Sequence, residues 1–254
     1  MSQLGRDVVR VRPRSARALG REALLVVAVY AVYSVIRNLA PQRGSLAEHN
    51  AWNGLRLEEA LRIDVEHGIN DFVVAHPWIA VPANYFYATL FLPAVVATLV
   101  WMWVRRPHVY SHYRTALVVM TLIGLICFWL YPLAPPRLLP GAGFVDTVPY
   151  FHTWGMDSSG PSNAGVSNQY AAMPSLHFGW SLWCGTTLWR CASRVWQRVV
   201  GVVYPLLTLL VILATANHYL LDAVGGAVAF VAADRLVSYV ERRRVGVPEA
   251  ARRG

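Results

Sequence analysis

Two histidines and an aspartate stand at spacings that suit nucleophilic or acid–base chemistry in an otherwise apolar chain. His218 and Asp222 are four residues apart, so on a helix their side chains lie on one face, one turn apart. The carboxylate can accept one imidazole N–H, which fixes the tautomer and leaves the other ring nitrogen available as a nucleophile or base. Ser175 and His177, in another apolar run, add a hydroxyl and a second imidazole.

Arg137 supplies the charge that such a group of residues needs for an anionic substrate. Its guanidinium is a fixed fork of donors suited to a pair of anionic oxygens, and phosphate is the common match. Ser175 stands near a predicted helix N-terminus, where unpaired backbone N–H groups also favour an anion. With one imidazole to attack and the other to protonate the leaving oxygen, the set predicts a phosphoryl-transfer site.

The elements that carry these residues are long uncharged stretches. The chain has 254 residues, of which 56% are hydrophobic and 15% charged, against about 25% charged in ordinary soluble domains. A helix of about 20 mostly apolar residues crosses a bilayer core. We therefore predict an all-α, polytopic membrane protein with a six-helix bundle. The expected spans are residues 20–40, 78–104, 113–132, 174–191, 198–216 and 219–240.

The arginines predict how these spans are oriented. All 23 basic residues are arginine, and with the N-terminus inside the cell 18 of them fall on the cytoplasmic side. The other five are Arg37, Arg43, Arg56, Arg62 and Arg137. Both termini are then cytoplasmic in a cell-membrane protein, and the candidate site lies on the extracytoplasmic face. The net charge of +9 reflects this topology, so no nucleic-acid partner is expected.

The domain division follows from the spans. Residues 1–20 form a basic cytoplasmic segment, residues 21–241 a six-span catalytic domain, and residues 242–254 a basic cytoplasmic tail.

Between the first two spans, residues 55–75 carry an apolar stripe with helical spacing, which predicts an amphipathic interfacial helix or, equally, a lid packed on the bundle. Residues 132–173 form a long loop whose aromatic residues favour an ordered structure.

The two histidine motifs resemble those of a known family. "MPSLHFGW" and "NHYLLDAVGG", with "APPR" upstream, are similar to motifs of the type 2 phosphatidic acid phosphatase superfamily, and most closely to its inositol phosphorylceramide synthase and inositolphosphotransferase-like branch. The resemblance implies metal-independent transfer through a phosphohistidine, with no cofactor. It makes His218 the nucleophile, Asp222 its orienting partner, His177 the general acid and base, and Ser175 a ligand of phosphate oxygens.

The chain also departs from the phosphatase pattern. Leu176 stands where the pattern has Gly, and Ile212 stands where it has an Arg six residues before the nucleophile. The first phosphatase motif is missing, so Arg137 is an inferred replacement for the missing phosphate ligands. Arg106 and Pro107 mimic part of that motif, but the expected topology puts them on the opposite face.

The expected activity is phosphotransfer from a lipid phosphate or phosphodiester to a polyol such as inositol, with water as the alternative acceptor. Two other functional classes remain open: a transporter or proton relay, and a metal site with His177, His218 and Asp222 as ligands.

Simpler structural roles are also open for single residues of the candidate site. Ser175 can be a helix cap, and Arg137 can snorkel at a helix end. Asp146 has a possible functional role instead, a hydrogen bond to the acceptor hydroxyl. Gly225 and Gly226 predict close helix packing. The sequence gives no oligomeric state.

Overall fold

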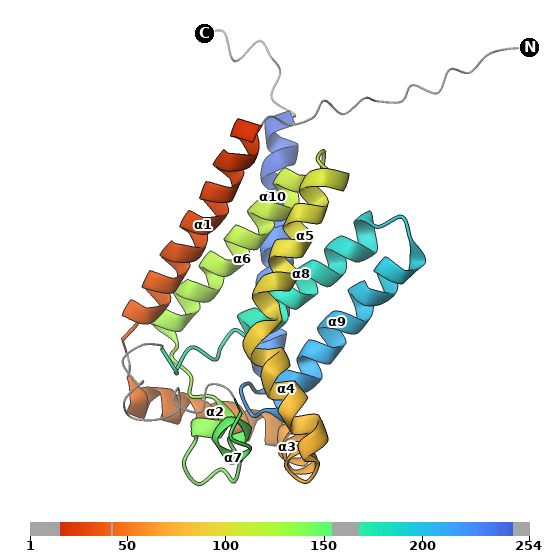
Figure 1. The fold of residues 1–254 in the computed structure, drawn as a ribbon. Helices are drawn as coiled ribbons and strands as arrows, with labels where there is room; N and C mark the ends of the chain where they lie inside the picture. The colour runs from red at the N-terminus through yellow and green to blue at the C-terminus, as the bar shows by residue number, and fades with distance from the viewer. Residues whose placement is uncertain (1–15, 42, 154–167, 246–254) are drawn as a thin grey trace, which may run out of the picture.

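The computed structural model describes residues 16–41, 43–153 and 168–245, and confirms the all-helical class (Figure 1). Within these ranges there is no strand, only an isolated bridge between Leu133 and Ala171. The helices of the bundle are α1 Ala16–Leu39, α4 Pro77–Thr89, α5 Phe91–Arg105, α6 Tyr110–Leu130, α8 Leu176–Cys191, α9 Val195–Ala214 and α10 Leu220–Val245. The remaining elements are α2 Gly44–Leu61, α3 Glu66–Val74, η1 Pro136–Leu138 and α7 Thr147–Tyr150.

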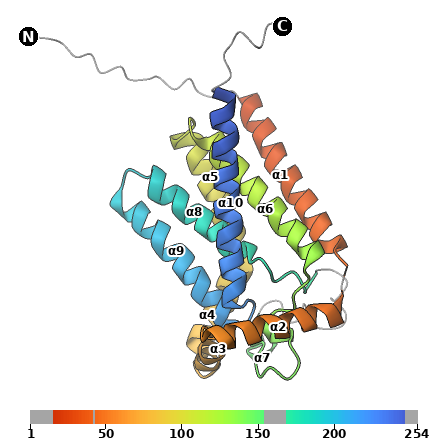
Figure 2. The same cartoon turned by 180° about the vertical axis from the view of Figure 1, so that it is seen from behind.

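The helices fall into two groups by direction. The bundle helices α1, α4–α6 and α8–α10 run roughly side by side, while α2, α3 and α7 gather at one end of the bundle (Figures 1 and 2). The opposite end holds the start of α1 and the ends of α5 and α10. Parts of the predicted cytoplasmic segments, residues 1–15 and 246–254, lie outside the described residues, as do residues 154–167 of the long loop.

The apolar helices support membrane insertion, with fewer clear spans than the six predicted. In the described part of the chain, Arg17–Leu39, Tyr110–Leu130 and Val195–Ala214 are each long and apolar enough to cross a membrane, and the pair α4 and α5 can count as a fourth span. The 16 residues of α8 extend about 24 Å, less than the core of about 30 Å. Charged residues such as Asp222 and Asp234 lower the hydropathy of α10.

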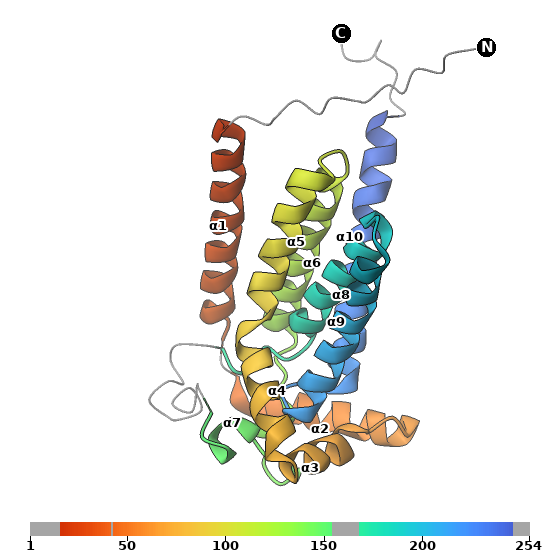
Figure 3. The same cartoon turned by 45° about the vertical axis from the view of Figure 1, so that its right-hand side comes forward.

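The second predicted span, residues 78–104, is not one straight helix. Helices α4 and α5 meet at Leu90 with a bend of 52°. Pro93 lies in the first turn of α5 and has no N–H to donate to the carbonyl of Thr89, four residues earlier. Pro93 therefore accounts for the bend, which turns α4 toward the end of the bundle where α3 lies (Figure 3).

The expected helix over residues 55–75 is two helices, and only part of the apolar stripe is buried, where Val73 lies in the core with Ile69 packed beside it. Arg62 ends α2 with a left-handed φ of 59°, and α3 starts at Glu66. Leu57, Leu61 and Phe72, all from the stripe, are at least half exposed. Glu58 and Glu66 are instead fully buried against the bundle. The apolar stripe alone does not predict the burial of these two carboxyl groups.

Close approach of helix backbones holds the three C-terminal helices together. A methyl group on Gly185 of α8 would lie 2.2 Å from the carbonyl oxygen of Gly201 in α9. On Gly226 of α10 it would lie 2.3 Å from the carbonyl oxygen of Ser175, and on Gly225 it would lie 3.2 Å from Pro174 Cβ. The predicted role of Gly225 and Gly226 in close packing is confirmed, and this packing brings the two histidine motifs together.

A substitution at Gly185 tests the α8–α9 contact. We expect Gly185→Ala to lower the free energy of unfolding by about 1–3 kcal/mol, because the added methyl forces the two backbones apart. Thermal unfolding in detergent measures the effect. Gly54→Ala is the matched control, since nothing lies within 4 Å of its added methyl. An unchanged midpoint in Gly185→Ala would contradict the packing described here.

Candidate functional site

His177 and His218 come from different helices and line the same cavity. His177 is the second residue of α8, and His218 lies in the turn that joins α9 to α10. Their ring centroids are 6.0 Å apart, and both rings line a cavity of about 440 Å³. The fold therefore brings two imidazoles from distant parts of the sequence to one cavity.

Asp222 orients the His218 imidazole. Its Oδ2 lies 3.3 Å from His218 Nδ1 and also accepts a hydrogen bond from the Tyr219 N–H at 3.0 Å. His218 Nε2 is buried and has no hydrogen-bond partner within the described residues. When Nδ1–H donates to Asp222, Nε2 carries a lone pair that no described residue binds.

The spacing of four residues predicts that His218 and Asp222 lie on one face of a helix. In the structure, the turn that precedes α10 brings these two side chains together instead. Because α10 begins at Leu220, His218 precedes the helix and Asp222 lies in its first turn. The N–H groups of Asn217 and His218 both donate to the carbonyl of Ile212, at 3.1 and 3.2 Å. Ala216 adopts a left-handed φ of 50°, which lets the chain reverse direction there.

Ser175 is the N-cap of α8, so the capping role considered from the sequence is confirmed. Its Oγ accepts a hydrogen bond from the Phe178 N–H at 3.3 Å. The side chain is fully buried, and Ser175 is not among the residues that line the cavity. Its own N–H donates to the carbonyl of Asp222 at 2.8 Å, so the backbone joins the two motifs directly. Contact between Ser175 and a phosphate oxygen stays a prediction.

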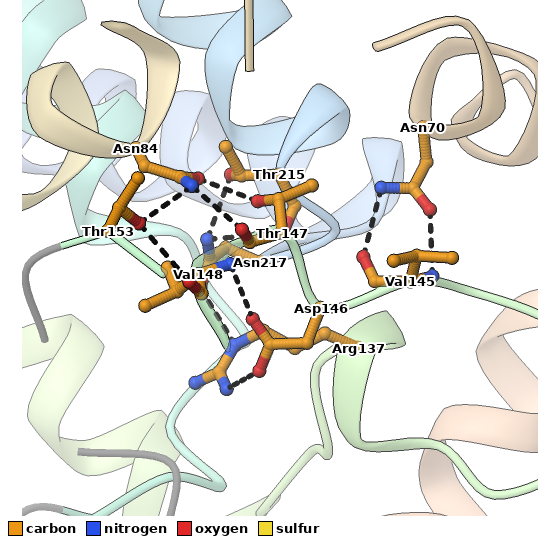
Figure 4. Close-up of polar contacts among 10 residues, drawn as sticks. All are labelled: Asn70, Asn84, Arg137, Val145, Asp146, Thr147, Val148, Thr153, Thr215 and Asn217. Atoms are coloured by element: carbon orange, nitrogen blue, oxygen red, sulfur yellow. Dashed lines mark hydrogen bonds and ion pairs between the residues drawn. The ribbon is translucent and has the colours of Figure 1, made fainter. Parts of the chain in front are cut away.

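Arg137 lies against the turn that carries His218 and is held in place by three hydrogen bonds, of which Figure 4 shows the two made by its side chain. Its Nε donates to Asn217 Oδ1 at 2.9 Å, and its Nη1 pairs with Asp146 Oδ2 at 3.0 Å. Its backbone N–H donates to the carbonyl of Ala216 at 2.9 Å. The guanidinium therefore does not merely snorkel at a helix end. Asp146 also caps α7 by accepting from the Val148 N–H, so the structure assigns it a partner other than an acceptor hydroxyl.

Two asparagines fasten the loop that carries Asp146 to the bundle (Figure 4). Asn84 of α4 donates to the Thr147 carbonyl and accepts from the Thr147 hydroxyl, at 3.0 and 2.6 Å. Asn70 of α3 bonds to both backbone groups of Val145 and to the carbonyl of Ala214. These buried amides fix the loop and, through Asp146, the guanidinium of Arg137.

Arg37 and Asn217 were not predicted as site residues. Arg37 lies in the last turn of α1, lines the cavity, and donates to the carbonyl of Asn168 at 3.4 Å. From the sequence, Arg37 served only to predict the orientation of the spans, although Arg37 and Arg137 are both expected on the extracytoplasmic side. Asn217, next to the nucleophile candidate, also lines the cavity. Two guanidiniums thus border the space next to the histidines, and both favour an anionic ligand.

Aromatic side chains form the other wall of the cavity. Tyr87 stacks on His177 with 4.5 Å between ring centroids, and Phe91 meets the same ring edge-on at 4.7 Å. A smaller apolar cavity of about 80 Å³ lies between α1, α5 and α6. The two cavities share Tyr30, Tyr33, Phe91 and Trp180 as lining residues. The apolar cavity therefore adjoins the cavity that holds the histidines.

The structure also places the remaining candidates. In the described part of the chain, no three His, Cys, Asp or Glu side chains are grouped so that they could hold a metal ion. Arg106 donates to the carbonyl of Cys191 at the C-terminal end of α8, far from the histidines at its start. Cys127, Cys184 and Cys191 are free thiols.

Two imidazoles and two guanidiniums line one cavity, and a carboxylate binds one of the imidazoles from outside it, so this group of residues can bind an anionic ligand. A sequence model of the PAP2 superfamily matches residues 55–236, well over half of the chain, and the protein belongs to this superfamily. Membership indicates an enzyme with a phosphatase or phosphotransferase type of activity. No curated protein and no solved structure matches the chain. The matched region contains every predicted site residue but not Arg37.

Removing either guanidinium tests the anion-binding role of the cavity. We expect Arg37→Gln and Arg137→Gln each to weaken binding of vanadate by about 10- to 100-fold, because a charge-assisted hydrogen bond contributes about 1.5–3 kcal/mol. Isothermal titration of the purified protein measures this affinity. Arg56→Gln, an exposed arginine of α2, is the control. Equal vanadate affinity in all four proteins would exclude the two arginines as ligands.

Proposed function

We propose that the protein is an integral membrane phosphotransferase that acts on a lipid phosphate or phosphodiester through a phosphohistidine at His218. The main support is the pair of imidazoles 6.0 Å apart in a cavity bordered by Arg37 and Arg137, in a member of the PAP2 superfamily. The lipid nature of the donor is supported by the apolar cavity that shares a wall with this site.

In the first step, His218 Nε2 attacks phosphorus while the bond from phosphorus to the leaving oxygen breaks. His177 donates a proton to that oxygen, and Asp222 stabilises the His218 ring by accepting its Nδ1–H. Arg37 and Arg137 balance the negative charge on the non-bridging oxygens. In the second step an acceptor hydroxyl attacks phosphorus, its proton passes to His177, and the phosphorus–nitrogen bond breaks.

The acceptor in this proposal is a polyol such as inositol, as the motif resemblance to the inositol phosphorylceramide synthase branch implies. Water is the alternative acceptor and would make the protein a lipid phosphate phosphatase. Both reactions share the first step and the same phosphohistidine, so they differ only in what enters the cavity during the second step. No cofactor or metal takes part in this scheme.

The proposed membrane arrangement has six spans, with both termini in the cytoplasm and the site at the outer face of the cell membrane. Arg105, Arg114 and Arg242 lie near one end of the bundle, whereas Arg37 and Arg137 lie at the other. This separation follows the preference of arginine for cytoplasmic segments. The exposed apolar side chains of α2 and α3 would then lie on the outer membrane surface.

Replacing each of the two histidines by alanine is expected to lower the catalytic activity to a different extent. We expect His218→Ala to abolish turnover of lipid phosphate, since the attacking atom is gone, and His177→Ala to lower kcat by about 10²- to 10⁴-fold. Rates measured on purified, folded variants in mixed micelles check this. His49→Ala, an exposed histidine of α2, serves as the control. Activity of His218→Ala near that of the wild type would reject the proposal.

The acceptor is identified by following labelled phosphorus. We expect label from a lipid phosphate to appear in a phosphorylated polyol when inositol or another candidate alcohol is supplied, because the alcohol competes with water for the same intermediate. Thin-layer chromatography separates this product from free phosphate. Release of free phosphate alone, with every alcohol tested, would assign the protein as a phosphatase.

A further inference from the structure

Two glutamates from the end of the bundle hold the start of the helix that carries Asp222. Glu58 of α2 and Glu66 of α3 are fully buried. Glu66 Oε1 accepts a hydrogen bond from the Leu220 N–H, and Glu58 Oε1 accepts one from the Leu221 N–H at 2.7 Å. With Tyr219 N–H bound to Asp222, three successive N–H groups donate to three different carboxyl groups.

The cap that Glu58 and Glu66 form on α10 differs from an ordinary helix N-cap because these residues are distant from the helix in the sequence. A helix start is usually capped by a Ser, Thr, Asp or Asn just before it, from the same chain segment. Here the caps come from residues more than 150 positions earlier in the sequence. The position of the first turn of α10 therefore depends on how α2 and α3 are seated on the bundle. That turn also holds Asp222, which orients His218.

The two carboxyl groups interact with each other as well as with the helix. Each keeps its Oε2 buried and without a hydrogen-bond partner among the described residues. Burial, together with the neighbouring carboxyls of Glu66 and Asp222, raises the pKa of Glu58 from 4.5 to about 8. Burial raises the pKa of Glu66 too. Two carboxyls that share a site do not readily ionise together, so one proton is retained at neutral pH.

We propose that Glu58 and Glu66 are positioning residues that share one proton, clamp the first turn of α10 and thereby set the orientation of the His218 imidazole through Asp222. The catalytic consequence rests on the proposed function of His218, whereas the shared proton does not. The clamp makes the seating of α2 and α3, the two helices at the proposed membrane surface, a condition for an active nucleophile.

The pH dependence follows from the direction of the pKa shift. The pKa of Glu58 is higher in the folded protein, so its contribution to stability is complete below about pH 4.5 and is lost as the pH rises through about 8. Above that pH a second negative charge is buried beside Glu66 and Asp222, and the Tyr219 hydroxyl faces the same group. The first turn of α10 then loosens.

The test compares Glu58→Gln, Glu58→Ala and the control Glu59→Gln, an exposed neighbour on α2, in the full-length protein. We expect kcat of the wild type to fall about tenfold per pH unit above about pH 8. Glu58→Gln keeps the hydrogen bonds of a protonated carboxyl, so its kcat at pH 7 stays within about twofold of wild type and no longer falls at alkaline pH. Glu58→Ala loses kcat at every pH, and Glu59→Gln behaves as wild type.

An alkaline loss in Glu58→Gln equal to that of the wild type would overturn the proposal, as would equal losses of kcat in Glu58→Gln and Glu58→Ala. The shared proton is also measured without turnover, by infrared spectroscopy of wild-type protein with ¹³C-labelled glutamate carboxyls. We expect a protonated-carboxyl band at pH 7 that disappears as the pH passes about 8. Absence of that band at pH 7 would refute the clamp even if the enzyme is active, and its presence in a protein without turnover would refute only the proposed function.

Discussion

The hydrogen bonds around the turn before α10 are the constraint on which the site depends. Five segments bond to the stretch from Ala216 to Asp222. The end of α9 contributes the carbonyl of Ile212, the start of α8 the N–H of Ser175, and the long loop the N–H of Arg137. The glutamates of α2 and α3 supply the remaining bonds. The imidazole of His218 is thus held by backbone and carboxyl groups from most of the bundle, and little freedom is left to it.

The second constraint is the polarity of the space in front of His218. Its lining combines polar residues, among them Arg137 and Asn217, with the aromatic rings of Tyr87 and Phe91, which pack against His177. Arg37 completes the cavity from α1, outside the region matched by the superfamily. We propose that Arg37 and Arg137, from two different segments, take the place of the phosphate ligands that the superfamily pattern has and this chain lacks.

Much of this arrangement could be predicted from the sequence, because it rests on local patterns. Apolar runs gave the helix positions to within a few residues, and the His218–Asp222 spacing gave a pair that the structure places at 3.3 Å. The bend between α4 and α5 was missed, although Pro93 marks it. The burial of Glu58 and Glu66 was not predicted, because a carboxylate on an amphipathic helix normally faces water. Their burial depends on partners more than 150 residues away, which no local pattern contains.

The most direct measurement of the central claim is the identity of the residue that carries phosphorus during turnover. The protein would be mixed with a labelled lipid phosphate, quenched at alkaline pH, digested and analysed by mass spectrometry. The account predicts a phosphoramidate on the peptide that contains His218, absent from His218→Ala. Label found instead on Ser175 or His177, or no covalent label while the lipid is consumed, would contradict it.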